Sequence, residues 1–360
     1  MQFLWHIEGL RMIYKTGEQI YKYKLINYIG GGNFGEVWLA EDISLNSTCA
    51  LKLLPKNDTT IDERLLEAKI GNRLQHPNVV NIKYADVINQ AQSPVVAIAM
   101  PFYSNGSILS QLNSGNFLST KTTIKCLIDV LRGLEYLHEN GYYHCDIKPN
   151  NILVGDNYEY ILSDYGITCY SPNQEAVHPR QCYLPHTSPE TIENDVYDVR
   201  TDIYQLGLTA FRLLNGISEI RCDFDRDRNQ FKENIKSGKV VTDNKFQPFI
   251  PRKIRRIINK AIALNPDERY QSALEMRRAL EQLALRGDCT TDASGNVVII
   301  SNDKAYRYEI EPISEKTSNF TVYQKNLKSN RETRVSAYTI KGIKNSEIKK
   351  KILSLVSDLI

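Results

Sequence analysis

Short apolar stretches, several of them alternating with polar residues, predict a strand-rich region over residues 23–100. Residues 23–29 and 36–40 alternate on either side of a glycine turn, which is typical of a β-hairpin. Further strands are predicted over residues 48–54 and 95–100. Between them, apolar residues recur at helical spacing over residues 62–74, so we expect one helix in this region.

The apolar spacing becomes helical after residue 106. Residues 122–139, 201–215, 252–264 and 272–285 carry apolar side chains at the period of an amphipathic helix. A strand-rich part followed by a helical part predicts an α+β fold with two lobes, a small β-rich N-lobe and a larger α-helical C-lobe.

A third pattern begins after Gly287. Residues 296–310 and 320–341 each predict a hairpin, and residues 347–359 predict an amphipathic helix, so we expect a small C-terminal ββββα-like appendage. The expected boundaries are 1–22 for an N-terminal extension, 23–288 for the main domain (N-lobe 23–103, C-lobe 104–288) and 289–360 for a small α+β accessory domain of unknown role.

Composition narrows the class of protein. The chain has 360 residues, of which 42% are hydrophobic and 24% charged, the mixture of an ordinary globular protein. A net charge of +3 is too small to indicate nucleic acid or a membrane surface as partner. We find no apolar run long enough to span a bilayer and no signal peptide. The seven cysteines are odd in number and form no Cys-x-x-Cys pair, which favours a reducing cytoplasm.

Candidate chemistry begins at Gly30-Gly31-Gly32-Asn33-Phe34-Gly35. Glycines let backbone amides approach phosphate oxygens, although such a turn alone is more often only a hairpin. Lys52, in the middle of the third strand, points away from its apolar neighbours. Either it is solvated or it faces phosphates and pairs with a helical carboxylate, for which Glu67 is the first choice and Glu63 the second.

The segment His144-Cys-Asp-Ile-Lys-Pro-Asn-Asn151-Ile-Leu153 carries the strongest signal. Phosphoryl transfer needs a carboxylate to orient the hydroxyl, a cation for the moving group and oxygen ligands for a metal. Asp146, Lys148 and Asn151 supply these groups on one loop. Asp164 follows on a strand and precedes Gly166, and its hard carboxylate oxygens suit magnesium held together with ATP phosphates.

Two structural markers follow in order. Glu190, in Ser188-Pro-Glu190, can form a buried bidentate ion pair with Arg269. Asp202 stands near a helix start and can accept backbone amides from the loop that carries Asp146. Each feature alone is more often surface charge, but their order along one chain favours the functional interpretation.

Together these residues resemble the eukaryotic-type (Hanks-type) serine/threonine protein kinase family over residues 23–285. The phrase His76-Pro-Asn-Val-Val80 resembles bacterial members of that family. The resemblance implies that Mg-ATP donates a phosphoryl group to serine or threonine hydroxyls of protein substrates, with Mn²⁺ as an alternative metal and autophosphorylation as an expected activity. It makes Asp146 the catalytic base, supported by Lys148, with Lys52 paired to Glu67. Asn151 and Asp164 would hold the metal.

The same resemblance assigns the nucleotide site. The glycines would cover the phosphates, Met100 would be the gatekeeper, and the Pro101 carbonyl and the Tyr103 amide would bind adenine at the hinge. The full set of nucleotide-binding residues is expected to be Ile29, Gly30, Gly32, Gly35, Val37, Ala50, Lys52, Met100, Pro101, Tyr103 and Leu153.

Four departures from the family pattern matter. Cys145 replaces an arginine that usually binds an activation-loop phosphate, so we expect activity that does not depend on that phosphate. Tyr165 replaces phenylalanine in the metal turn. Gly71 stands where an apolar residue usually packs behind that aromatic ring, at a cost of about 1 kcal/mol of helix stability relative to alanine. Thr187-Ser188 alters the segment before Pro189-Glu190, so we expect the substrate-facing pocket to differ from that of the family.

Two other functions remain open on the sequence. A pseudokinase scaffold would be expected to lack Lys52, Asp146, Asn151 or Asp164, and all four are present. A small-molecule kinase would lack the full glycine loop and the Glu190–Arg269 pair. Residues 289–360 are expected either to dock a substrate or partner or to brace the main domain, and the sequence does not choose between them or indicate an oligomeric state.

Overall fold

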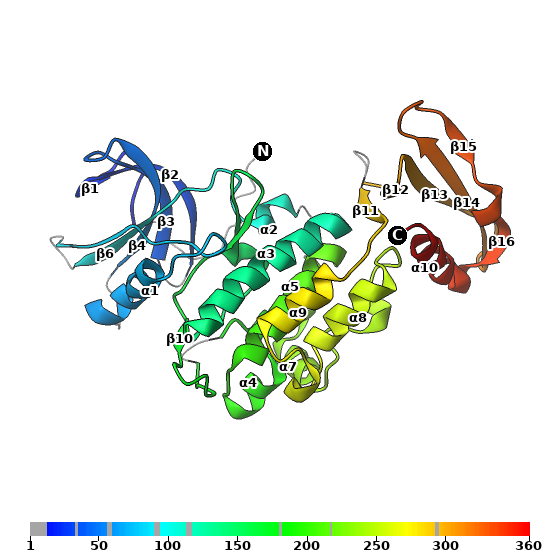
Figure 1. Ribbon diagram of the computed structural model, residues 1–360. Helices are drawn as coiled ribbons and strands as arrows, with labels where there is room; N and C mark the ends of the chain where they lie inside the picture. The colour runs from blue at the N-terminus through cyan, green and yellow to red at the C-terminus, as the bar shows by residue number, and fades with distance from the viewer. Residues whose placement is uncertain are drawn as a thin grey trace. The chain divides into compact units, whose positions relative to one another are not determined.

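The computed structural model describes residues 13–32, 35–55, 60–89, 94–112, 117–179, 182–216, 218–291 and 295–360 (Figure 1). Residues 1–12 of the predicted extension and the tip of the glycine turn, Asn33 and Phe34, lie outside the described residues. The chain forms two compact units, which we call the N-terminal unit (Met1–Gly106 with Leu153–Thr168) and the C-terminal unit (Ser107–Ile152 with Cys169–Ile360).

The N-terminal unit is built on an antiparallel sheet with strand order β1-β2-β3-β4-β6-β5. Its strands are β1 (Gln19–Ile20), β2 (Tyr23–Gly32), β3 (Gly35–Asp42), β4 (Ser47–Leu54), β5 (Tyr84–Ile88) and β6 (Val95–Met100). Helix α1 (Ile61–Arg73) follows β4. The apolar pattern did not predict β1 and β5, because β1 has only two residues and β5 is an edge strand whose side chains are mostly exposed.

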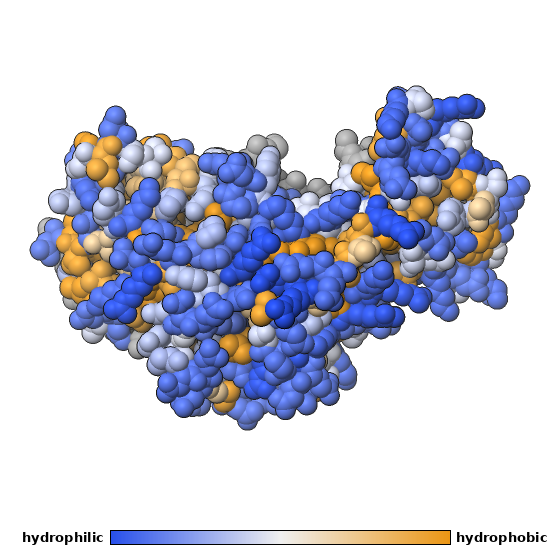
Figure 2. Space-filling model, in the orientation of Figure 1, coloured by the Kyte–Doolittle hydropathy of each residue, from blue (hydrophilic) through white to orange (hydrophobic). Residues whose placement is uncertain are grey.

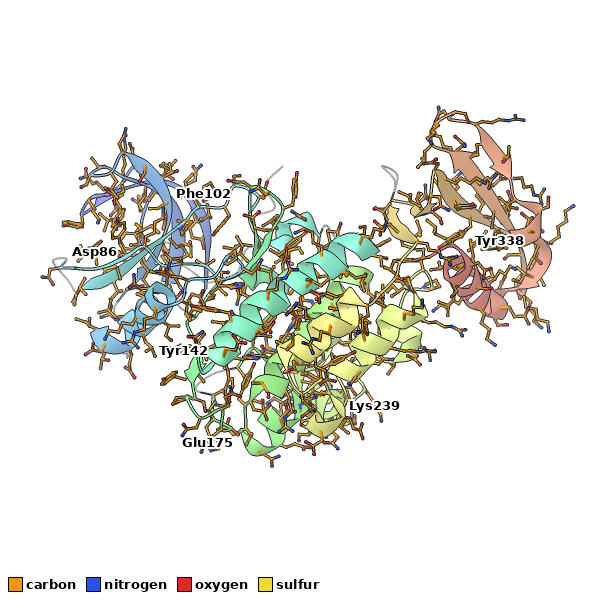
Figure 3. The ribbon with its side chains drawn as sticks, in the orientation of Figure 1. Asp86, Phe102, Tyr142, Glu175, Lys239 and Tyr338 are labelled. Carbon is orange, nitrogen blue, oxygen red and sulfur yellow. The ribbon has the colours of Figure 1, made fainter. Side chains whose placement is uncertain are left out.

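One face of this sheet forms a hydrophobic core that extends beyond the predicted domain start. Tyr14 and Ile20 are 3% and 2% exposed and join Trp38 and Leu51 in that core. Asp86 in β5, labelled in Figure 3, accepts a hydrogen bond of 2.9 Å from the hydroxyl of Tyr23. Residues 13–22 therefore fold as part of the N-terminal unit.

Capping explains where α1 begins. Thr60 accepts from the amide of Glu63, and the Glu63 carboxylate accepts from the amide of Thr60, so two amides at the start of the helix are satisfied reciprocally. Glu63, the second candidate partner for Lys52, is thus used as a cap.

Helices dominate the first two thirds of the C-terminal unit. They are α2 (Ile108–Gln111), α3 (Thr120–Glu139), α4 (Pro189–Asn194), α5 (Val199–Asn215), α6 (Ser218–Arg226), α7 (Arg228–Lys236), α8 (Arg252–Ala261) and α9 (Ala273–Glu281), with short strands β7 (Tyr142–Tyr143) and β10 (Cys169–Tyr170) paired to each other. Ser119 caps α3, and Gly141 follows it at φ +76°, a conformation that suits glycine at a helix C-terminus. The predicted α+β class is confirmed by these elements, although the sequence pattern missed the charge-rich α6 and α7.

A second sheet, six-stranded in the described residues, corrects the predicted four-stranded appendage. Its elements are β11 (Gly287–Thr291), β12 (Val297–Ser301), β13 (Lys304–Pro312), β14 (Thr317–Asn326), β15 (Glu332–Arg334), β16 (Ile340–Lys344) and the helix α10 (Ile348–Leu359). The pattern missed β11 because it is short and polar. The strand predicted to end the second hairpin is split in two, because a 3₁₀ turn at Ser336–Tyr338 interrupts it while both halves pair with β14.

This second sheet is joined to the helices of the same unit by specific contacts. Asp288 in β11 accepts a 2.9 Å hydrogen bond from the amide of Lys121 in the first turn of α3. The thiol of Cys289 donates to the carbonyl of Phe249, and the Phe249 ring stacks on Phe117 at 4.2 Å between centroids. A hydrogen bond to a carboxylate and one from a thiol therefore join the second sheet to the helical part.

Polar and charged side chains cover most of the surface drawn in Figure 2, and apolar patches are scattered among them, as is normal for globular domains. Among the described residues, no helix has the length and apolar character needed to cross a membrane.

Candidate active site

Lys52 lies on the face of β4 opposite the hydrophobic core. Its neighbours Leu51 and Leu53 are fully buried in that core, while Lys52 is paired across the sheet with Val37 and Ile98. Strand alternation thus places the ammonium on the face shared with Val37, as the sequence suggested.

Lys52 forms an ion-pair network with two carboxylates of the N-terminal unit. Its Nζ donates to Oε1 and Oε2 of Glu67 at 2.8 and 2.7 Å and to Oδ1 of Asp164 at 3.0 Å. Burial alone would lower the pKa of Lys52, but the carboxylates of Asp164 and Glu67 outweigh that effect and raise it. Burial also raises the pKa of Glu67, against the attraction of Lys52. Lys52 is therefore charged and held between the two carboxylates.

Gly166 keeps space open beside this network. A Cβ at that position would lie 3.2 Å from Oδ1 of Asp164, 3.8 Å from Oε2 of Glu67 and 3.9 Å from Nζ of Lys52. A side chain there would cover the polar atoms. The glycine thus leaves the space beside these atoms unfilled.

The predicted glycine loop is the end of the β2–β3 hairpin. Gly30 pairs with Val37 and Gly32 with Gly35 across the two strands. Gly35 has φ +119°, and a Cβ there would lie 2.1 Å from the carbonyl oxygen of Leu53. Only glycine fits this position, whereas a Cβ on Gly30 would meet nothing within 4 Å.

The residues assigned to adenine by resemblance all belong to the N-terminal unit. Ala50 is buried and pairs across the sheet with Met100. Val37, Met100, Pro101, Tyr103 and Leu153 are half-buried, and Ile29 is 44% exposed. Apart from the buried Ala50, the apolar members of this set are partly exposed, as contact with the flat face of a base requires.

The turn that carries Asp164 is anchored by Tyr165. The Tyr165 side chain is 2% exposed, and its hydroxyl donates to the carbonyl oxygen of Val80 at 2.6 Å. Its ring packs against Gly71 of α1, where a Cβ would lie 3.0 Å from Cε2 of Tyr165 and 2.5 Å from Cδ1 of Ile82. The hydroxyl anchor was not foreseen from the sequence, and the tyrosine and the glycine fit each other.

The loop of the C-terminal unit gathers the three residues predicted to act in transfer. Nζ of Lys148 lies 2.9 and 2.7 Å from the two carboxylate oxygens of Asp146. The amide nitrogen of Asn151 donates to Oδ2 and to the carbonyl oxygen of Asp146, both at 2.9 Å. Because the Asn151 nitrogen is turned to Asp146, its amide oxygen is presented in another direction.

Helix α5 fixes the backbone of this loop. Asp202, fully buried, accepts from the amides of His144 and Cys145, both at 2.9 Å, and its side chain also contacts His138 at 2.8 Å. Burial opposes ionisation of Asp202, but hydrogen bonds led by that of His138 lower its pKa overall. Gln205 adds a contact from the Ile147 amide to its side-chain oxygen at 2.8 Å. The predicted role of Asp202 is confirmed, whereas those of His138 and Gln205 were not foreseen.

The Glu190–Arg269 ion pair is also present. Nη1 and Nη2 of Arg269 each lie 2.8 Å from a carboxylate oxygen of Glu190, and Arg269 is 1% exposed. Cys145 is 1% exposed as well, with its thiol 3.4 Å from the Tyr143 carbonyl oxygen. A buried thiol therefore stands where the family pattern has a cation.

Each unit contributes one of the two predicted metal ligands, and the chemistry of each ligand fits magnesium. Asp164 offers a carboxylate that is 31% exposed, and Asn151 offers an amide oxygen, both hard ligands of the kind Mg²⁺ prefers. In the described part of the chain no group of three or more histidine, cysteine, aspartate or glutamate side chains could hold a metal by itself. Phosphate oxygens would therefore have to complete the coordination.

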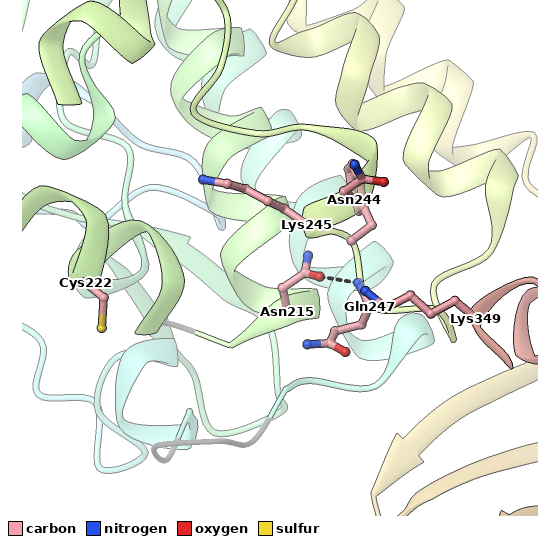
Figure 4. A pocket seen from close by; sticks show the side chains of 7 residues that line it. Asn215, Cys222, Asn244, Lys245, Gln247 and Lys349 are labelled. Atoms are coloured by element: carbon pink, nitrogen blue, oxygen red, sulfur yellow. Dashed lines mark hydrogen bonds between the residues drawn. The ribbon is translucent and has the colours of Figure 1, made fainter. Parts of the chain in front are cut away.

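A pocket of about 380 Å³ lies elsewhere in the C-terminal unit (Figure 4). It is lined by Asn215, Cys222, Asn244, Lys245, Phe246, Gln247 and Lys349. Lys245 is paired with Asp223 at 2.7 Å, and Asn215 accepts from the Gln247 amide at 2.8 Å. None of the predicted site residues lines this pocket.

Comparison with known proteins adds an independent finding. Residues 23–282 match the family described as protein kinase domain. The serine/threonine-protein kinase PrkC of Bacillus subtilis is 28% identical over 263 residues, which cover 71% of this chain and 39% of PrkC. The serine/threonine-protein kinase PknB of Mycobacterium leprae is 26% identical over 267 residues, covering 72% of this chain and 42% of PknB.

A third relative is the serine/threonine-protein kinase PknD of Chlamydia trachomatis, 28% identical over 308 residues that cover 74% of this chain and 32% of PknD. The chain thus spans less than half the length of these relatives.

Proposed function

Because the chain belongs to the protein kinase family, as its motifs predict, we propose that it transfers the γ-phosphoryl group of Mg-ATP to serine and threonine hydroxyls of proteins. Protein kinases as a family use ATP with a divalent metal and act on protein substrates. The observation that carries the proposal is Asp146, whose carboxylate is held by Lys148 and Asn151 on a loop fixed to α5.

Most of the residues proposed to bind ATP belong to the N-terminal unit. The backbone amides at Gly30, Gly32 and Gly35 would cover the phosphates, and the Lys52 ammonium, held by Glu67, would contact them. Asp164 and Asn151 would hold Mg²⁺, or Mn²⁺ in its place. The metal, when bound, would supply positive charge that stabilises the charge developing on the phosphate oxygens.

The transfer step is assigned to the loop of the C-terminal unit. Asp146 would accept the proton of the attacking hydroxyl, since a carboxylate in this role orients the nucleophile. Lys148 would stabilise charge on the moving phosphoryl group. Asn151 holds Asp146 in a fixed orientation through its amide nitrogen.

Serine and threonine are favoured over tyrosine as acceptors. The lysine two residues after the base resembles serine/threonine kinases, and the three relatives described above carry that name. A pseudokinase scaffold is not favoured, because Lys52, Asp146, Asn151 and Asp164 all retain contacts suited to transfer.

The proposal extends to domain organisation. We assign the catalytic domain to residues 13–286 and an accessory domain to residues 287–360, because residues 13–22 join the first core and β11 joins the second sheet. The hydrogen bond from the Lys121 amide to Asp288, with the contact of Cys289 to Phe249, supports a brace for the helical lobe rather than a docking module. Since ATP is the donor and free thiols suit a reducing compartment, the proposed site of action is the cytoplasm.

The test is incubation of the purified chain with γ-labelled ATP, Mg²⁺ and a general protein acceptor. Wild-type protein should label itself or the acceptor on serine or threonine, as located by mass spectrometry, and Asp164→Ala should abolish labelling. Asp62→Ala, which removes an exposed aspartate at the start of α1, is the matched control and should label like wild type. Equal labelling by wild type and Asp164→Ala, or none by either, would overturn the proposal.

A further inference from the structure

The segment just before Ser188-Pro-Glu190 contacts the loop that carries Asp146. Tyr183, half-buried, places its ring 4.5 Å from the ammonium of Lys148. The same ammonium contacts both carboxylate oxygens of Asp146. Lys148 thus lies between a carboxylate and an aromatic face, within the range of a cation–π contact.

A buried histidine holds this segment in place. His186 is fully buried, with Nε2 2.7 Å from Nη1 of Arg212 and Nδ1 2.9 Å from the carbonyl oxygen of Ile147. A guanidinium can only donate, so Nε2 must accept and the ring proton must sit on Nδ1, donating to Ile147. Burial, reinforced by Arg212 and Lys148, holds the pKa of His186 well below its usual value and keeps it neutral.

The position of Tyr183 follows from that anchor. Its carbonyl oxygen accepts from the amide of His186 at 2.8 Å and from the hydroxyl of Thr187 at 3.1 Å. The rings of Tyr183 and His186 are 5.9 Å apart and tilted by 34°. The ring over Lys148 is therefore carried by a backbone that is itself tied to the loop through Ile147.

Two attractions act on the same cation. Asp146 alone would draw the ammonium onto the carboxylate that is proposed to accept the substrate proton. An aromatic face on a separate, anchored segment restricts the positions that the flexible lysine can take. The Lys148 side chain is only 18% exposed, so water competes weakly for its ammonium.

We propose that Tyr183 is a positioning residue for phosphoryl transfer, whose ring holds the Lys148 ammonium in place while His186 anchors the segment that bears it. This inference rests on the proposed kinase activity. It also gives the altered segment before Pro189 a role: His186 anchors the segment, and Tyr183 contacts the loop that carries Lys148.

The kinetic test uses Tyr183→Leu, which keeps apolar bulk but lacks an aromatic face, and Tyr183→Phe, which keeps the face. Loss of a cation–π contact of about 1 kcal/mol corresponds to about a fivefold change in rate. We expect Tyr183→Leu to lower kcat about fivefold at unchanged KM for ATP, and Tyr183→Phe to restore kcat to within about twofold of wild type. Tyr323→Leu is the matched control, because it removes a similar contact of 4.3 Å to Arg307 in the second sheet and should leave kcat unchanged.

A spectroscopic readout separates this inference from the kinase proposal. In ¹³C-lysine-labelled protein, an aromatic face shields the ε-methylene protons of Lys148, whose signal Lys148→Arg identifies by its disappearance. The upfield shift should persist in Tyr183→Phe and vanish in Tyr183→Leu. If wild type is an active kinase but the Leu variant matches the Phe variant in kcat, or the shift is insensitive to both substitutions, the inference is wrong while the kinase proposal stands. An inactive wild type with the shift intact would instead count against the kinase proposal.

Discussion

Replacing Gly71 by alanine tests whether the missing side chain is a weakness of α1 or a fitted feature. On helix propensity alone, an alanine in this helix should stabilise the protein by about 1 kcal/mol. The structure predicts the opposite sign. A Cβ at Gly71 would lie 2.5 and 2.6 Å from Cδ1 and Cγ1 of Ile82 and 3.0 Å from Cε2 of Tyr165.

The neighbours cannot easily yield. The Ile82 amide donates to the Gly71 carbonyl oxygen at 3.2 Å, so the backbone around Ile82 is tied to the helix. Tyr165 is held by its 2.6 Å hydrogen bond to Val80. Overpacking costs about 1–3 kcal/mol, and contacts as short as 2.5 Å place this site in the upper part of that range, at about 2–3 kcal/mol. Subtracting the gain in propensity of about 1 kcal/mol leaves a net destabilisation of about 1–2 kcal/mol.

The assay is urea unfolding followed by Trp38 fluorescence, because Trp38 is 1% exposed in the core of the same unit. A double-mutant cycle with Ile82→Ala isolates the clash. The double variant should be more stable, by about 1 kcal/mol or more, than the sum of the two single effects predicts. Because Gly71 lies one turn after Glu67, we also expect KM for ATP to rise in Gly71→Ala. A Gly71→Ala protein more stable than wild type, with no coupling to Ile82, would refute the reasoning.

Three further predictions concern the C-terminal unit. His186 is neutral in the folded protein, whereas in the unfolded chain it takes up a proton near pH 6.5, so its contribution to folding stability is complete above that pH and falls as the pH drops through it. The wild type should therefore lose about 1.4 kcal/mol of stability between pH 7.5 and 5.5, and His186→Gln should not. Urea unfolding at each pH measures this loss. Asp288→Asn should destabilise the protein by about 0.5–1 kcal/mol in low salt, because the first turn of α3 has no acidic residue of its own, and the difference should shrink in 1 M salt. Since Cys145 offers no cation to a phosphate, phosphatase treatment should leave kcat within about twofold, and an inactive dephosphorylated protein would contradict this.

The fold was predictable wherever one period of apolar residues determined burial. Helix α3 has a clear apolar stripe, and the structure extends its predicted start by only two residues. The alternation in β3 matches its alternating burial. β5, on the sheet edge, gives no such signal, and α7 buries only Phe231 and Ile235. The interruption at Ser336–Tyr338 depends on pairing with β14, which a local pattern cannot report.

The residues of the candidate site also fall into two groups, those that the sequence predicted and those that only the structure revealed. Residues that supply charge at fixed spacing, such as Lys52 and Asp146, stand out in the sequence because their chemistry requires those residue types. Residues that act through packing do not. The contact of Tyr183 with Lys148 and the hydrogen bond from Tyr165 to Val80 join positions distant in the chain, and only the three-dimensional structure brings them together.

Two of the four departures from the family pattern, Gly71 and Tyr165, compensate each other within this chain. Gly71 loses a side chain where Tyr165 adds a hydroxyl, and that hydroxyl finds the carbonyl of Val80. A histidine at position 186 would be costly if charged, and the adjacent Arg212 both keeps it neutral and satisfies its second nitrogen. Departures that compensate each other in this way are expected of a working site rather than of one in decay. This is the physical reason for expecting activity despite four unusual positions.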